Sequence, residues 1–125
     1  MILKEATSKY YNPIVEKSFR FAVRIIKFYK VKSKDNYNLN SIFKQLLRSG
    51  TSIGANVSEA QSAFTKKDFI NKLGISLKES RETEYWLKLL KESDIISEKE
   101  FISLFNDCEE LSKLLTAIIK SSKET

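Results

Sequence analysis

The chain contains no histidine, and it has only one cysteine, one proline and three glycines among its 125 residues. Without histidine, a His-based catalytic triad and a histidine metal ligand are both excluded. The single cysteine, Cys108, cannot form an internal disulfide or a cysteine-cluster metal site. Because glycine and proline favour tight turns, their scarcity favours long helices over a many-stranded sheet.

Long apolar runs are also missing. No run approaches the roughly 20 residues that a transmembrane helix needs, so we predict no membrane span. One free thiol and no recognisable secretory signal are typical of the reducing cytoplasm, which is the predicted location. Cys108 lies in an apolar pattern with Phe105 and Leu111, and this favours a small buried side chain over a nucleophile.

Four segments carry apolar residues at helical spacing and are separated by polar residues. The first begins at Asn12-Pro13, an N-cap residue followed by a favourable first helical residue. The third and fourth begin at the capping-box sequences Thr65–Asp68 and Ser97–Glu100, and Phe64 and Phe69 flank the former as a hydrophobic staple would.

Four helices with short connections predict an all-α protein, an antiparallel up-down-up-down four-helix bundle. We expect one domain, because 125 residues is within the usual domain size. Residues 12–120 would form the bundle, residues 1–11 an N-terminal tail or short extension, and residues 121–125 a frayed C-terminal tail.

The second segment includes a stretch of low helix propensity in which Gly50 and Gly54 are four residues apart. On one continuous helix these glycines share a face and would let another backbone approach closely. We predict one helix with a notch at Gly50 and Gly54. The alternative is two shorter helices that are separated at Gly50.

The first segment has more apolar residues than a bundle helix requires. One stripe contains Val15, Phe19 and Ile26, and a second beside it contains Ile14, Phe21, Ile25 and Phe28. Phe21 and Phe28 fall at the margin of the arc, and burying a Phe side chain contributes about 1.5–3 kcal/mol. We therefore predict self-association through an interface containing Phe21, Phe28, Gly50 and Gly54. The alternative is that the loop after this helix covers both phenylalanines.

Charge is concentrated in the same segment. The net charge is +6, and residues 1–35 carry nine Lys and Arg against three acidic residues. Four cations spaced three, four and three residues apart form one line, which two further lysines extend: Lys17, Arg20, Arg24, Lys27, Lys30 and Lys34. A rigid line of cations suits the phosphates of a nucleic acid, so we predict these residues as a binding site for RNA or DNA. The alternatives are a solvated helix face and, less favoured, attachment to a membrane surface.

Two carboxylates, Glu79 and Glu82, are three residues apart and share a helix face. A di-metal bundle site would need a second carboxylate pair or histidines, and the sequence has neither in a matching arrangement. We therefore expect ion pairs or hydrogen bonds at these residues. The predicted sites include no catalytic residue, no metal ligand and no cofactor.

Two blocks carry a specific pattern, QLLRSGTSIGANVSEA from Gln45 to Ala60 and FINKLGISLKESRETEYWLKLL from Phe69 to Leu90. They resemble the four-helix-bundle proteins encoded in intervening sequences of 23S ribosomal RNA genes. The resemblance implies a homopentamer with no established activity and no catalytic residues to transfer. A related branch, the accessory variability proteins of diversity-generating retroelements, comprises basic pentamers that partner a reverse transcriptase and nucleic acid.

Composition, charge and resemblance together predict a non-enzymatic, oligomeric accessory protein that binds nucleic acid through the basic stripe of its first helix. Its partners would be further copies of the chain, RNA or DNA, and a protein such as a reverse transcriptase. The alternative is a protein-interaction scaffold with no nucleic-acid role.

Overall fold

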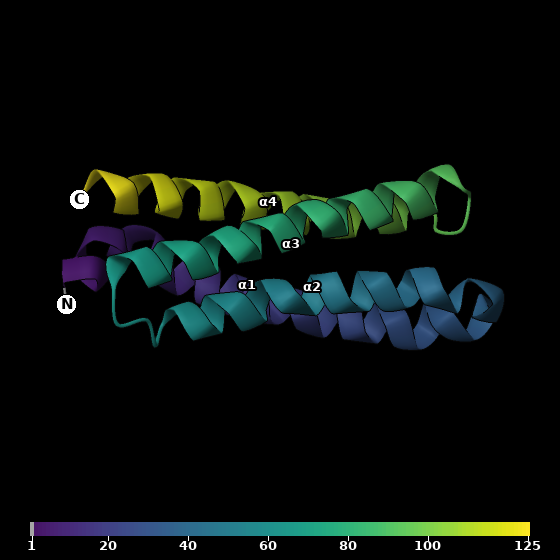
Figure 1. Cartoon of the computed structure of the whole chain (residues 1–125). Helices are drawn as coiled ribbons and strands as arrows, with labels where there is room; N and C mark the ends of the chain where they lie inside the picture. Colours follow the sequence, from purple (N-terminus) through teal and green to yellow (C-terminus); the bar gives the residue numbers. More distant parts are fainter. Residues whose placement is uncertain (1) are drawn as a thin grey trace.

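The computed structural model describes the backbone of residues 2–125 and the side chains of residues 13–125. Its elements are α1 (Ile2–Asp35), a 3₁₀ turn (Tyr37–Leu39), α2 (Asn40–Ala60), α3 (Lys66–Glu92) and α4 (Glu98–Glu124). The helices run alternately up and down, so that α1 and α3 each pack against α2 and α4 (Figure 1). The predicted all-α antiparallel four-helix bundle is confirmed.

Both predicted outer limits of the bundle helices differ from the structure. α1 begins at Ile2 and contains Pro13, so the predicted start at Asn12-Pro13 is wrong. Proline removes one backbone hydrogen bond, but packing of the buried Ile14 that follows it helps to hold the helix together. At the other end α4 continues through Glu124 and buries Ser122, so residues 121–125 are not a frayed tail. The side chains of residues 1–11 lie outside the described residues, and their role stays a prediction.

Two of the predicted helix starts are confirmed in detail. The Ser97 hydroxyl oxygen accepts from the Glu100 N–H at 3.0 Å, while the Glu100 carboxylate accepts from the Ser97 N–H at 2.9 Å. At α3, the Thr65 hydroxyl oxygen accepts from the Asp68 N–H. The predicted staple is wrong, because the Phe64 side chain is fully exposed. α3 therefore begins with the Thr65 cap and without a hydrophobic contact between Phe64 and Phe69.

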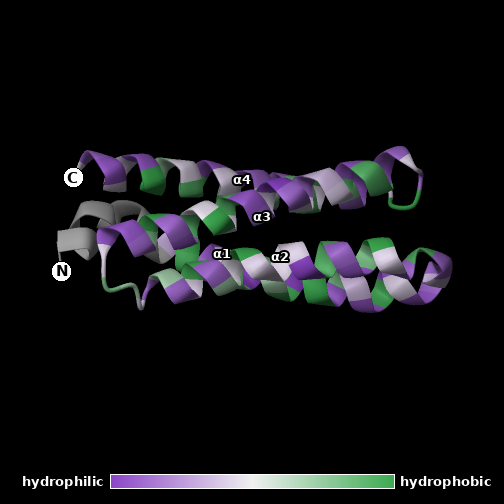
Figure 2. Ribbon diagram, viewed as in Figure 1, coloured by the Kyte–Doolittle hydropathy of each residue, from purple (hydrophilic) through white to green (hydrophobic). Residues whose placement is uncertain are grey.

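The core positions follow a heptad spacing of three and four residues in each helix. In α3 this series includes Ser76, Ser80 and Thr83 among the apolar residues, and all three are buried. Heptad spacing keeps one seam of each helix against its neighbours. Figure 2 shows the result, with hydrophobic and hydrophilic residues alternating around every helix. Small polar side chains therefore lie among the apolar ones in the middle of the bundle.

α2 is one continuous helix through Gly50 and Gly54, as predicted. The notch accepts α1 of the same chain. A methyl group on Gly54 would lie 3.1 Å from the Ser18 carbonyl oxygen, and one on Gly50 would lie 3.0 Å from Ile25. The two glycines thus let α1 of the same chain lie close against α2, where a larger side chain would have to displace atoms of α1.

The rotation of α1 about its axis differs from the expected one. Phe21 is 2% exposed and lies in the core, so its predicted place at the margin is wrong, while Phe19 is 69% exposed. Phe28 is partly buried, and its ring centroid lies 6.4 Å from that of Phe43 on α2. Because Ser18 is small enough to lie against Gly54, the stripe that contains Ser18 faces inward. α1 does have exposed apolar surface beyond the core, as predicted, but this surface is formed by Phe19 and Ile26.

Candidate nucleic-acid interface

Half of the predicted basic stripe is engaged in ion pairs. Lys17 lies 2.6 Å from a Glu110 carboxylate oxygen on α4. Arg24 pairs with Asp107, and its guanidinium also donates to the Ser103 hydroxyl at 2.7 Å. These contacts join α1 to α4, and each places a carboxylate beside a cation that was assigned to phosphate binding.

Arg20 pairs with Glu16 one turn earlier on the same helix. Both side chains are largely exposed, and exposed pairs of this kind contribute only about 0–1 kcal/mol. A phosphate can therefore compete for Arg20 more readily than for Arg24. Lys32 is not among the six predicted residues, and its ammonium lies 2.8 Å from a Glu100 carboxylate oxygen.

The other three cations of the predicted stripe remain available. Lys27, Lys30 and Lys34 are exposed in the last three turns of α1, and none forms an ion pair with any of residues 13–125. The structure thus brings together a shorter basic surface than the sequence predicted. Its members lie near the end of α1 that leads into the 3₁₀ turn.

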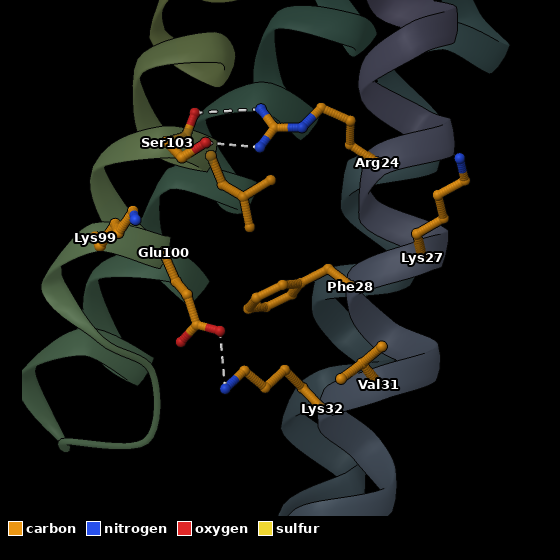
Figure 3. A pocket seen from close by; sticks show the side chains of 9 residues that line it. Arg24, Lys27, Phe28, Val31, Lys32, Lys99, Glu100 and Ser103 are labelled. Carbon is orange, nitrogen blue, oxygen red and sulfur yellow. Dashed lines mark hydrogen bonds and ion pairs between the residues drawn. The ribbon is translucent and has the colours of Figure 1, made fainter.

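Beside these lysines a groove runs between α1 and α4 (Figure 3). Its volume is about 490 Å³. It is lined by Arg24, Lys27, Phe28, Val31, Lys32, Lys99, Glu100, Ser103 and Leu104. The Lys32–Glu100 pair crosses one end, and the bonds from Arg24 to Ser103 cross the other. This groove could not be predicted from the sequence, because its two walls are about 70 residues apart in the chain.

The Glu100 carboxylate at this end of the bundle is held in its charged form. Burial opposes ionisation, but hydrogen bonds from the Lys32 ammonium and the Ser97 N–H outweigh it and lower the pKa of Glu100 below its ordinary value. The Lys32–Glu100 ion pair is therefore charged at neutral pH, and it spans one end of the groove.

Glu79 and Glu82 form ion pairs, as expected, and their common partner is Arg48. The Arg48 guanidinium lies 3.0 Å from the Glu79 carboxylate and also donates to Glu82. The Trp86 indole N–H donates to Glu82 at 2.9 Å. This bond, and then Arg48, lower the pKa of Glu82 against the opposing effect of burial. A carboxylate pair bridged by arginine is a contact between α2 and α3, and it leaves no open site for a metal ion.

A buried polar network joins α3 and α4 further inside. The Ser112 hydroxyl donates to the Glu84 carboxylate at 2.7 Å and lies 2.7 Å from the Ser80 hydroxyl. The Cys108 thiol donates to the Ser80 carbonyl oxygen, and burial, together with the nearby Glu84 charge, raises its pKa well above the ordinary value. Cys108 is therefore a buried protonated thiol, as predicted, and unsuited to act as a nucleophile.

Two further findings bear on the site. Among residues 13–125, no three His, Cys, Asp or Glu side chains are grouped so that they could hold a metal ion. Within the part of the chain that is described, no helix is both long and apolar enough to cross a bilayer.

Comparisons with known proteins agree with the fold. The family model for 23S rRNA-intervening sequence proteins matches residues 12–117. A crystal structure from Bacteroides thetaiotaomicron, described as a protein of unknown function from the S23 ribosomal protein family, is 49% identical. The match covers 89% of this chain and 98% of that one, with a TM-score of 0.85. No curated protein matches the chain. On the family match and this structural likeness, the chain belongs to the 23S rRNA-intervening sequence protein family.

Proposed function

We propose that this protein is a non-enzymatic accessory protein that binds the phosphate backbone of a nucleic acid through Lys27, Lys30 and Lys34. The observation that carries this proposal is the exposure of these three lysines on one helix, without a carboxylate partner among residues 13–125. Lys17 and Arg24 contribute less, because Glu110 and Asp107 already neutralise them.

The geometry suits backbone recognition without sequence specificity. At about 1.5 Å per residue, the seven steps from Lys27 to Lys34 cover about 10 Å of the helix axis. A nucleic-acid strand has a phosphate about every 3.4 Å along the axis of B-form DNA, so three cations match a short run of phosphates. No exposed aromatic side chain lies between these lysines, so the surface offers nothing on which a base would stack.

The test is fluorescence anisotropy with a labelled RNA hairpin and a labelled DNA duplex over a series of salt concentrations. For duplex DNA, loss of three phosphate contacts in the triple variant Lys27→Gln, Lys30→Gln, Lys34→Gln should reduce the slope of log K against log salt by about 2.7. The matched control, Lys17→Gln, Arg20→Gln, Arg24→Gln, removes the same charge from residues that already have acidic partners. We expect it to reduce the slope by less.

Two outcomes would contradict the proposal. One is the absence of binding at low salt by protein whose helical circular dichroism is intact. The other is an equal effect of the two triple variants, since net charge alone, rather than the lysines named here, would then account for binding.

A second candidate function, a protein-interaction scaffold, is favoured by the groove between α1 and α4. It predicts that the first triple variant leaves every cellular role of the protein unchanged, although it has lost these three charges.

A further inference from the structure

We infer that the groove between α1 and α4 is a docking site for a short acidic segment of a protein partner, which would place one or two large apolar side chains in the groove. The inference rests on an apolar floor, a rim with surplus positive charge and the size of the groove. It does not depend on nucleic-acid binding.

The floor and one wall of the groove are apolar. Phe28 points from α1 toward α4, and Val31 forms part of the α1 wall (Figure 3). Leu104 of α4 also lines the groove. The Val31 side chain is 62% exposed, so it is open to contact by a ligand in the groove. Covering this surface with an apolar side chain would remove it from water, at about 25 cal/mol per Å² of area buried.

The rim selects for negative charge. Lys27 on α1 and Lys99 on α4 are exposed and form no ion pair with residues 13–125. The one carboxylate in the lining, Glu100, is already paired with Lys32. An apolar ligand without charge would leave both lysines unused, whereas Asp or Glu residues flanking an apolar anchor could pair with them.

The dimensions favour a peptide segment. From Arg24 to Lys32 the α1 wall spans eight helical steps, or about 12 Å at about 1.5 Å per residue. That length holds about two turns of a helix, and a volume of about 490 Å³ accepts one or two large side chains. Aliphatic walls such as Val31 and Leu104 suit an aliphatic or aromatic side chain, while a nucleobase would also need polar partners for its edges.

The experiment is selection of 12-residue peptides from a random display library against the full chain. We expect the enriched peptides to share one or two large apolar residues flanked by Asp or Glu. Their affinity, measured with fluorescein-labelled synthetic copies, should fall at least about tenfold with Val31→Ser combined with Lys99→Gln, a loss of about 1.4 kcal/mol or more.

Controls separate this site from the rest of the surface. Ile102→Ser removes another exposed apolar side chain, on α4 and outside the groove lining, and it should leave peptide affinity unchanged. Lys30→Gln with Lys34→Gln lies outside the groove lining, so it should weaken RNA binding and keep peptide binding. Val31→Ser should weaken peptide binding and keep RNA binding. The proposals for peptide docking and for nucleic-acid binding can therefore be contradicted independently.

The inference is overturned if no peptide is enriched, if the enriched peptides are neutral or basic, or if their affinity survives Val31→Ser with Lys99→Gln. It is also overturned if the RNA hairpin does not displace the peptide but binds more weakly to the Val31→Ser variant. The groove would then be part of the nucleic-acid surface.

Discussion

The contact between Gly54 and the Ser18 carbonyl oxygen sets how closely α1 and α2 approach. A Cβ atom on Gly54 would meet this backbone oxygen at 3.1 Å, and backbone cannot rotate away as a side chain can. The notch was predictable because glycines four residues apart share a helix face. Which helix enters it was not, because Ser18 is polar and was not counted with the core.

Gly54→Ala should destabilise the protein by about 1–3 kcal/mol, the usual effect of overpacking a close contact. Gly74→Ala is the matched control, because a Cβ there has no atom within 4 Å and lies on the same kind of helix. Removing a helix-interior glycine should stabilise the protein by up to about 1 kcal/mol. Urea denaturation followed by circular dichroism measures both. Equal changes in the two midpoints would mean that the Gly54 contact does not limit the approach of the helices.

At the scale of whole helices, number, direction and most boundaries could be predicted, because periodic apolar residues and caps act within each segment. The face that a helix turns inward depends on its neighbours. α1 has two apolar stripes, and the structure buries the one that contains Phe21, together with Ser18, in the core. On α3 the apolar residues Leu73 and Leu87 are buried as their spacing predicts. Ser76 and Ser80 continue the same heptad spacing, but serine alone gives no apolar signal.

Ion pairing between helices explains why the predicted site was only partly right. The stripe from Lys17 to Lys27 is visible in one helix, but the carboxylates of Asp107 and Glu110 that reduce its charge are about 80–90 residues away. No rule acting within one helix predicts which cations meet acids on another. Lys30 and Lys34 escape this pairing because they lie on the outer side of α1.

The α3–α4 contact should depend on its buried hydroxyls. Ser112→Ala removes the hydroxyl that donates to the buried Glu84 carboxylate at 2.7 Å and leaves it the longer bonds from Arg81, so we expect a loss of about 1.5–3 kcal/mol, the usual contribution of a hydrogen bond to a charged group. Ser122→Ala is the control, because the buried Ser122 hydroxyl has no hydrogen-bond partner among the described residues. Its removal should cost nothing. Thermal unfolding by calorimetry compares them, and a Ser112→Ala protein as stable as Ser122→Ala would show that the network does not stabilise the bundle.

At the scale of the molecule, the outer side of α1 is the surface that a single bundle leaves unexplained. Phe19 and Ile26 are exposed on this side. Beside them lies a hollow of about 410 Å³ whose lining includes Phe19, Val15, Gly54 and Val57. Exposed apolar side chains next to a hollow favour an interface over a solvated face. We propose that copies of the chain associate here, through Phe19 and Ile26 in place of the predicted Phe21.

Light scattering at micromolar concentration should therefore show a particle of several chains. Phe19→Ser with Ile26→Ser should reduce the number of chains, whereas Phe64→Ser with Ile102→Ser, matched in residue type and at least as exposed, should not. An oligomer repeats the surface formed by Lys27, Lys30 and Lys34, and linked weak sites bind a long polyanion more tightly than one site does. The dissociated variant should hence bind a long RNA more weakly with its lysines intact. A wild-type protein that is monomeric under these conditions would remove the proposal of self-association, and any RNA affinity would then belong to a single bundle.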